Sequence, residues 1–255
     1  MTIHSHREQN VQEEQYGFPY HYVPEYAEGV FSQTQHWSWG FRYLGGIQLV
    51  LEQLSRDEFS SLIDVGCGDG RFLREVALAY PNVRTLGVDY SAQAVRLASA
   101  FNPNLRFLQM NIAHERVDQS FDCATLVEVL EHVPPDEVEA FVAGVAATLK
   151  RSGRLVATVP HVNKPVSDKH FQHFSQRTLS EVLEPHFSDM VFFPFDNLNA
   201  FLMRIAVRMM GGSGENIIVT NRRLSAKFYE LYLSRYLYVD DEAKCGRIAV
   251  VCRKK

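Results

Sequence analysis

Three glycines, Gly66, Gly68 and Gly70, stand at alternate positions in the segment DVGCGDG. Glycine at such positions lets a backbone approach a ligand closely, because it has no Cβ and readily adopts left-handed conformations. Asp89 follows after about twenty residues, the spacing at which a carboxylate binds ribose hydroxyls in dinucleotide-binding folds. Arg71 takes the place of the third glycine of a dinucleotide fingerprint, and no G-K-[ST] of a P-loop follows. The loop therefore predicts a nucleoside ligand with a free ribose and no pyrophosphate.

Histidines and acids with the chemistry of proton transfer or metal binding occur further along the chain. Histidine can accept a proton near neutral pH, because its usual pKa is about 6.5. In a helical turn, Glu128, Glu131 and His132 would share one side, and His170 or His173 could add a further ligand for a divalent metal. Four histidines follow expected strand ends: His132, His161, His170 and His173.

The elements that must position these residues alternate between strand and helix from residue 61 onward. This alternation predicts an α/β fold with a doubly wound, mostly parallel sheet of seven strands. Ligands of such sheets bind beyond the carboxyl ends of the strands, where the glycine loop and the histidines are expected. The expected strands are residues 61–66, 84–89, 105–112, 121–129, 153–160, 189–195 and 246–254. The expected helices are residues 70–80, 92–101, 135–150, 175–187, 199–210 and 223–239.

The chain divides into a short tail and one large domain. We expect residues 1–15 to be a disordered tail and residues 16–255 to form a single domain. Within it, residues 16–54 form an aromatic segment whose second half, from about Phe41, is helical, and about residues 197–238 form a helical insertion with a flexible break at GGSG. The aromatic segment either covers a pocket or packs on the sheet; it contains Tyr20, Tyr22, Trp37, Trp39 and Tyr43.

Composition restricts the class of protein. The 255 residues carry a formal net charge of −4, which argues against a protein whose main task is to coat nucleic acid. The polar N-terminus does not resemble a signal peptide, and no apolar run approaches the roughly 20 residues that span a bilayer. We therefore expect a cytoplasmic protein with reduced thiols. None of its four cysteines forms a C-x-x-C pair: Cys67, Cys123, Cys245 and Cys252.

Several motifs in this order resemble the class I S-adenosylmethionine-dependent methyltransferases. They are DVGCGDG (64–70), GVDYS (87–91), VEVLEHV (127–133) and LKRSGRLVATVP (149–160). The resemblance covers roughly residues 55–195 and implies a Rossmann-like fold, with S-adenosylmethionine as cofactor and S-adenosylhomocysteine as product.

The resemblance assigns roles around the cofactor. Gly66 and Gly68 would approach its methionine part, and Asp64 would orient the loop or contact the amino group. Tyr90 would flank the adenine, and Asn111 is the nearest equivalent of an Asp that binds the adenine amine in many members. The full set of expected cofactor-binding residues is Asp64, Gly66, Cys67, Gly68, Asp89, Tyr90, Asn111 and Glu128.

The methyl acceptor is predicted to be a small molecule. The pattern KHFQHFS resembles that of methyltransferases of small molecules and saccharides, which implies transfer to an oxygen of a sugar or sugar-like metabolite. A hydroxyl acceptor must lose its proton, so we expect His170 or His173 to be the base. His132 completes the catalytic candidates, and Glu128 and Glu131 would help to shape the pocket.

Two alternatives remain open at this point. The E-x-x-E-H pattern is similar to that of Hen1-type RNA 2′-O-methyltransferases, in which a metal would be held by Glu128, Glu131, His132 and His173. The Phe-Glu-Trp of that family is absent, because Phe174 is followed by Ser-Gln, and the pattern also occurs in methyltransferases without metals. We therefore expect no metal and no nucleic acid partner. The second alternative is a non-catalytic nucleoside-binding scaffold.

The expected insertion is basic and amphipathic. Such a helix can contact a membrane surface or bind an anionic acceptor or RNA, but it can also be the solvated face of a cap or an oligomer. Its basic residues are Arg204, Arg208, Arg222, Arg223, Lys227 and Arg235.

Overall fold

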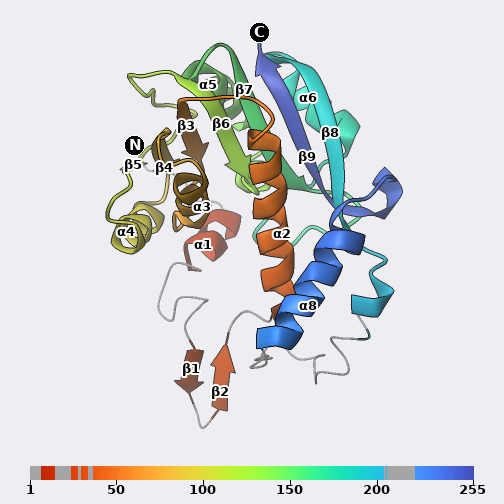
Figure 1. The fold of residues 1–255 in the computed structure, drawn as a ribbon. Helices are drawn as coiled ribbons and strands as arrows, with labels where there is room; N and C mark the ends of the chain where they lie inside the picture. Colours follow the sequence, from red (N-terminus) through yellow and green to blue (C-terminus); the bar gives the residue numbers. More distant parts are fainter. Residues whose placement is uncertain (1–6, 15–23, 28–29, 34–36, 204, 206–221) are drawn as a thin grey trace.

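The computed structural model describes residues 7–14, 24–27, 30–33, 37–203, 205 and 222–255. Seven strands form one sheet in the order β5-β4-β3-β6-β7-β9-β8 (Figure 1). β9 runs antiparallel to both neighbours, whereas the other pairs are parallel, so the predicted fold class is confirmed. The strands are β3 (Ser61–Val65), β4 (Arg84–Asp89), β5 (Phe107–Gln109), β6 (Phe121–Val127), β7 (Leu149–Pro160), β8 (Phe187–Asn197) and β9 (Cys245–Lys254).

The order of the strands creates a crevice in the middle of the sheet. The chain enters at β3, moves outward through β4 to β5, and returns to β6 on the other side of β3. Helices that follow β3 and β6 consequently diverge from this point, where doubly wound sheets bind their ligands.

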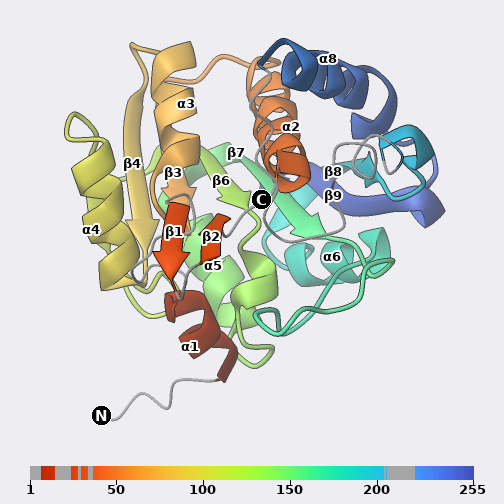
Figure 2. The same cartoon turned by 90° about the horizontal axis from the view of Figure 1, so that it is seen from below.

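Helices cover both faces of the sheet (Figure 2). α2 and α3 pack on one face, where Leu54 and Leu73 bury against Leu62 of β3. On the other face, Phe141 of α5 and Leu179 of α6 belong to the larger core. The helices are α1 (Arg7–Glu14), α2 (Trp37–Leu54), α3 (Arg71–Ala79), α4 (Ala92–Phe101), α5 (Val138–Thr148), α6 (Gln176–Leu183) and α8 (Arg222–Tyr232).

Local chemistry explains where several helices begin and end. Ser91 caps α4, because its Oγ accepts the N–H of Ala94 at 3.1 Å, as its position in the sequence predicts. Ser175 and Thr178 form a capping box at the start of α6. At the end of α2, the buried guanidinium of Arg154 donates to the carbonyls of residues 53 and 54 at 3.1 and 2.9 Å, which satisfies two of the last carbonyls of the helix.

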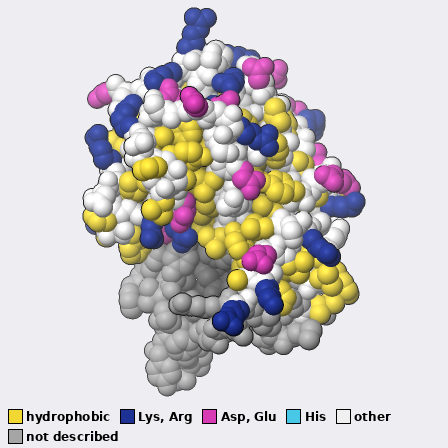
Figure 3. Space-filling view, in the orientation of Figure 1, with side chains coloured by type: hydrophobic (Ala, Val, Ile, Leu, Met, Phe, Trp, Pro, Cys, Tyr) yellow, Lys and Arg dark blue, Asp and Glu magenta, His cyan; other side chains and the backbone are white. Residues whose placement is uncertain are grey.

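The C-terminal insertion packs on α2 (Figure 1). α8 continues into a π-helical turn, Leu233–Leu237, and buries Tyr232 and Leu237 against Leu49 of α2. The expected helix at 199–210 and the GGSG break lie largely outside the described residues. Among the expected basic residues, Arg223, Lys227 and Arg235 are exposed. On the face in Figure 3, side chains of both charges are interspersed with apolar surface.

The N-terminal region differs from expectation in two ways. Residues 7–14 form α1 where a disordered tail was predicted, because Arg, Glu and Gln favour helix and no Gly or Pro interrupts them. In residues 16–54, the helix begins at Trp37 and not at about Phe41, and β1 (Pro24–Ala27) and β2 (Val30–Gln33) form an antiparallel hairpin before it. Of the helices that the structure describes, none combines the length and apolar character needed to cross a bilayer.

Candidate functional site

A cavity of about 660 Å³ lies at the carboxyl ends of the central strands. Its volume is in the range of small-molecule sites, about 300–1,000 Å³. The wall is formed by the loops after β3, β4, β5, β6 and β7, by β9, and by the first half of α2, which contributes Tyr43. Tyr43 is thus one aromatic residue of the N-terminal segment that does face the pocket. Tyr20 and Tyr22, and the side chains of Trp37 and Trp39, lie outside the described part of the chain.

The glycine loop forms one side of the cavity and requires its glycines. Gly66, Gly68 and Gly70 all have positive φ, at 73°, 53° and 77°. A Cβ on Gly66 would lie 2.6 Å from a methyl carbon of Val129, so a larger residue would force the loop away from the segment that follows β6. The backbone of this loop therefore lies directly at the cavity, without side chains between them at Gly66 and Gly68.

Asp89, at the end of β4, is connected to the glycine loop. One carboxylate oxygen accepts the N–H of Gly68 at 2.9 Å, and the other accepts the N–H of Ser91 at 2.9 Å. These bonds fix the carboxylate at the cavity wall. Tyr90 and Asn111 line the cavity beside it. The side-chain carbonyl of Asn111 accepts the N–H of residue 113 at 3.1 Å, which leaves one lone pair of that oxygen for a ligand.

Asp64 and Cys67 lie deeper in the same wall. Asp64 is buried, and desolvation raises its pKa to about 7, although a hydrogen bond from Thr125 at 2.8 Å opposes the shift. The negative charge of Asp89 adds to the rise. Burial also raises the pKa of the Cys67 thiol well above its usual range, which makes a nucleophilic role for this cysteine unfavourable.

The segment after β6 does not form the single helical turn that the sequence suggested. Glu128 has a positive φ of 58° and precedes a 3₁₀ turn at Leu130–His132. Its carboxylate lies 3.5 Å from the guanidinium of Arg247 on β9. Because this backbone bend separates Glu128 from the turn, its side chain pairs with Arg247 instead of joining Glu131 and His132.

A chain of hydrogen bonds orients the histidines of the loop after β7. The carbonyl of Lys164 can only accept, so the Nδ1–H of His173 donates to it at 3.0 Å. Nε2 of His173 then accepts the Nδ1–H of His170 at 2.8 Å, which leaves the Nε2 lone pair of His170 free of this chain. In the same way, His132 donates its Nδ1–H to the carbonyl of Lys169 at 2.8 Å. All three histidines line the cavity.

His161 lies outside this group. Its Nε2–H donates to Glu242 at 3.0 Å, and its Nδ1 accepts the N–H of Asn163 at 3.1 Å. It is absent from the cavity wall, so among the four histidines considered it has a structural position.

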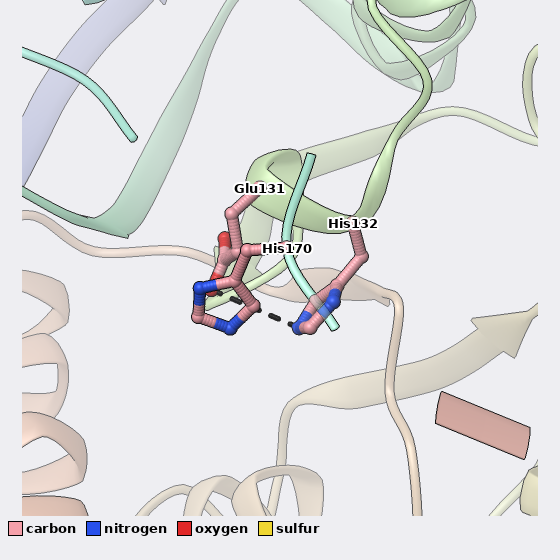
Figure 4. A group of neighbouring side chains, drawn as sticks. All are labelled: Glu131, His132 and His170. Carbon is pink, nitrogen blue, oxygen red and sulfur yellow. Dashed lines mark ion pairs between the residues drawn. The ribbon is translucent and has the colours of Figure 1, made fainter. Parts of the chain in front are cut away.

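Glu131, His132 and His170 converge at one point (Figure 4). One ligand atom of each lies within 4.8 Å of the others, and the rings of the two histidines meet edge to face with centroids 4.7 Å apart. A backbone bond from Phe171 to the carbonyl of Glu131, at 2.8 Å, holds the histidine loop on the 3₁₀ turn. The metal set considered from the sequence is thus altered: His170 takes the place of His173, and Glu128 is not part of the cluster.

Burial keeps the histidines neutral. Desolvation lowers the pKa of His132 to about 4 and that of His170 well below its usual range, and neighbouring positive groups add to the latter shift. The pKa of His173 is also lowered, first by desolvation. Glu131 shows the opposite effect, because desolvation and the charge of Glu128 raise its pKa well above the usual range. Neutral imidazoles with oriented lone pairs can accept a hydrogen bond from a substrate hydroxyl or bind a metal.

The sequence reasoning missed the basic side of the cavity. These residues come from α2, the loop after β7 and β9, three segments far apart in sequence, and no local motif connects them. They are Arg42, Lys164, Lys169 and Arg247. Arg247 stands within the apolar strand GRIAVVCRK, where a charge at a buried position was the available signal.

The central part of this chain is similar in sequence to known proteins. Residues 62–153 match the protein-family model described as "Methyltransferase domain". The demethylspheroidene O-methyltransferase of Rhodobacter capsulatus is 37% identical over 95 residues, which are 37% of this chain and 24% of that protein. A trans-aconitate 2-methyltransferase of Afipia carboxidovorans is 29% identical over 111 residues, which are 44% of this chain and 43% of that protein. The chain thus spans less than half the length of both relatives.

Solved structures share the fold over most of the chain. A SAM-dependent methyltransferase from Archaeoglobus fulgidus aligns with a TM-score of 0.57 at 15% identity, covering 84% of this chain and 94% of that one. N-methyltransferase NodS from Bradyrhizobium japonicum, solved with S-adenosyl-L-homocysteine, aligns with a TM-score of 0.53 at 13% identity, covering 84% and 87%. Residues 62–153 thus resemble a methyltransferase domain, and the fold of the chain is similar to that of S-adenosylmethionine-dependent methyltransferases.

Proposed function

We propose that the protein transfers a methyl group from S-adenosylmethionine to an oxygen of a small-molecule acceptor. The observation that carries the proposal is that one cavity joins the glycine loop with neutral, oriented histidines. Matched relatives that are named as methyltransferases of small molecules support it. The bound cofactor supplies an electrophilic methyl group on a sulfonium, so the protein mainly has to align the acceptor and receive its proton.

His170 is our candidate for the group that receives the proton. Its Nε2 carries the free lone pair, whereas both ring nitrogens of His173 are already used in hydrogen bonds. We therefore assign His173 the role of a positioning residue that fixes the tautomer of His170. His132, oriented by the carbonyl of Lys169, would hold the acceptor hydroxyl from a second side. A sugar or sugar-like hydroxyl remains the acceptor we favour, and a cytoplasmic location remains a prediction from the sequence.

Cofactor binding tests the first half of this proposal. We expect calorimetry to show that Asp89→Ala weakens S-adenosylhomocysteine binding at least about tenfold, since two ribose hydroxyls lose a charged partner. Asp118→Ala removes an exposed carboxylate that precedes the amino end of β6 and does not line the cavity, and it serves as the matched control. Unchanged affinity in Asp89→Ala would reject the assignment of the site. A scaffold without activity would bind the cofactor yet form no S-adenosylhomocysteine with any acceptor offered.

The convergence of Glu131, His132 and His170 favours a second candidate, metal-assisted methyl transfer as in the Hen1-type enzymes. Each histidine donates its other ring N–H to a fixed acceptor, as metal-binding histidines do, and Glu131 Oε2 is buried with no hydrogen-bond partner among the described residues. Isothermal titration with Mn²⁺ and Co²⁺ distinguishes the candidates. Stoichiometric binding that His170→Ala abolishes would support this second function, and full activity after chelation would reject it.

A further inference from the structure

Four basic side chains line the half of the cavity that lies beside β7 and β9. Arg247 comes from β9, Lys164 and Lys169 from the loop after β7, and Arg42 from α2. Arg247 is only 8% exposed, although it carries a full charge. Four converging cations in a cavity that also binds a sulfonium cofactor need a source of negative charge, because buried charges are stable only when they are paired.

The protein supplies part of that negative charge. Asp196 is fully buried and lies 3.4 Å from Arg42, 3.7 Å from Arg247 and 4.0 Å from Lys164. Glu128 lies 3.5 Å from Arg247. One carboxylate is thus shared among three cations, and a second one is partnered by the same arginine.

Lys169 lacks a direct ion pair with any described residue, although the charges of Glu131 and Glu128 act on it. No ion pair or side-chain hydrogen bond joins its ammonium group to the part of the chain that the structure describes. The remaining acid nearby is Glu131, which faces the histidines. Even if Glu131 is counted as ionised, the four cations outnumber the three carboxylates in this half of the cavity.

Two further observations support the binding of an anionic ligand by these cations. The Nε of Arg247 is buried and forms no hydrogen bond with the described residues, although the carboxylates of Glu128 and Asp196 lie 3.5 and 3.7 Å from it. Desolvation lowers the pKa of Lys164, and the charge of Arg247 lowers it further, although Glu128 and Asp196 oppose the shift. An anion bound here would stabilise all three charged side chains and would offset the positive charge of the cofactor.

We propose that the methyl acceptor carries a carboxylate or phosphate group, which binds to Lys169, Lys164 and Arg247 and so places the acceptor hydroxyl beside His170. This inference rests on the proposed function and specifies its substrate class. In the reaction, a bond forms between the acceptor oxygen and the methyl carbon as the carbon–sulfur bond breaks. The electron pair of that bond passes to sulfur, and the hydroxyl proton passes to His170 and then to solvent.

Calorimetry with simple anions tests the site without knowledge of the natural acceptor. Inorganic phosphate and citrate would be titrated into the protein saturated with S-adenosylhomocysteine, with glycerol as the uncharged probe. We expect one of the two anions to bind with 1:1 stoichiometry, and which one binds distinguishes phosphate from carboxylate. Lys169→Gln should weaken this binding at least about tenfold, since a desolvated charge contact is lost. Lys227→Gln removes an equal charge from the exposed face of α8 and should change nothing.

Each outcome of this titration supports or rejects the proposed anion site. If neither anion bound, or if wild type and Lys169→Gln bound it equally, the inference would be overturned. Binding of S-adenosylhomocysteine in the same experiment would still support the cofactor site. If the wild-type protein did not bind S-adenosylhomocysteine at all, that result would instead contradict the proposed function. Circular dichroism would show whether Lys169→Gln folds. If it folds poorly, Lys164→Gln serves as the second test and should also weaken anion binding.

Discussion

Replacing Asp64 by Asn should stabilise the protein in the absence of cofactor, and the gain should depend on pH. The pKa of Asp64 rises from 3.8 to about 7 on folding, chiefly because burial disfavours the charged carboxylate. The folded state therefore holds this proton more tightly than the unfolded state. The resulting stabilisation is fully present below pH 3.8 and is lost as the pH rises through about 7.

The size of the effect follows from that difference. About three pH units, at about 1.4 kcal/mol each, give an upper limit of about 4 kcal/mol above pH 7. Asn is nearly isosteric, stays uncharged at every pH, and its side-chain oxygen can still accept the hydrogen bond of Thr125. Asp64→Asn should thus match the wild type near pH 4 and exceed it increasingly up to about pH 7, after which the difference becomes constant.

Urea denaturation between pH 4 and pH 9 measures this difference in the free energy of unfolding. Asp136→Asn, at an exposed position, serves as the control and should run parallel to the wild type. Parallel curves for Asp64→Asn and wild type would refute the reasoning. The same carboxylate is our candidate for the amino group of the cofactor, so cofactor affinity of the wild type should fall as the pH is lowered below about 7, and Asp64→Asn should lose that dependence.

Three further predictions concern the glycine loop, the histidines of the cavity and the buried Arg154 at the end of α2. Gly66→Ala should destabilise the fold by about 1–3 kcal/mol and abolish cofactor binding, because the positive φ and the 2.6 Å approach to Val129 both oppose a Cβ; urea denaturation and calorimetry measure the two effects. ¹⁵N NMR should show His170 as the Nδ1–H tautomer in the wild type and in His173→Gln, and a changed tautomer in His173→Ala; the same tautomer in all three would contradict the positioning role. Arg154→Leu should cost about 2–4 kcal/mol in urea denaturation, because two helix-end carbonyls lose their donors in a buried position, and a smaller loss would mean that water replaces them.

Much of the fold could be predicted from local patterns. The strand at Ser61–Val65 and the helix at Arg71–Ala79 follow from an apolar run, a glycine turn and an amphipathic repeat, each contained in a short window. The ends of elements were less predictable. α6 stops at Leu183 and β8 begins at Phe187, whereas the apolar spacing continued the helix to Phe187, because pairing with β9 determines where the strand starts.

The site was predictable only where its residues are neighbours in sequence. The glycine loop and Asp89 were found because one βαβ unit contains them. The choice between His170 and His173 could not be made from sequence, since it depends on which ring nitrogens the carbonyl of Lys164 and the neighbouring ring occupy. Arg247 was missed because it reaches the cavity through sheet pairing between β7 and β9, a contact between residues about ninety positions apart.

The insertion of β9 between β7 and β8 sets an order of events during synthesis. The residues of β3, β4 and the glycine loop are synthesised before those of β7, β8 and β9. β7 has an open edge until β9 arrives, and Arg247 reaches the acceptor side on that same strand. Until β9 is synthesised, the edge of β7 is a place where a nascent chain can pair with another chain.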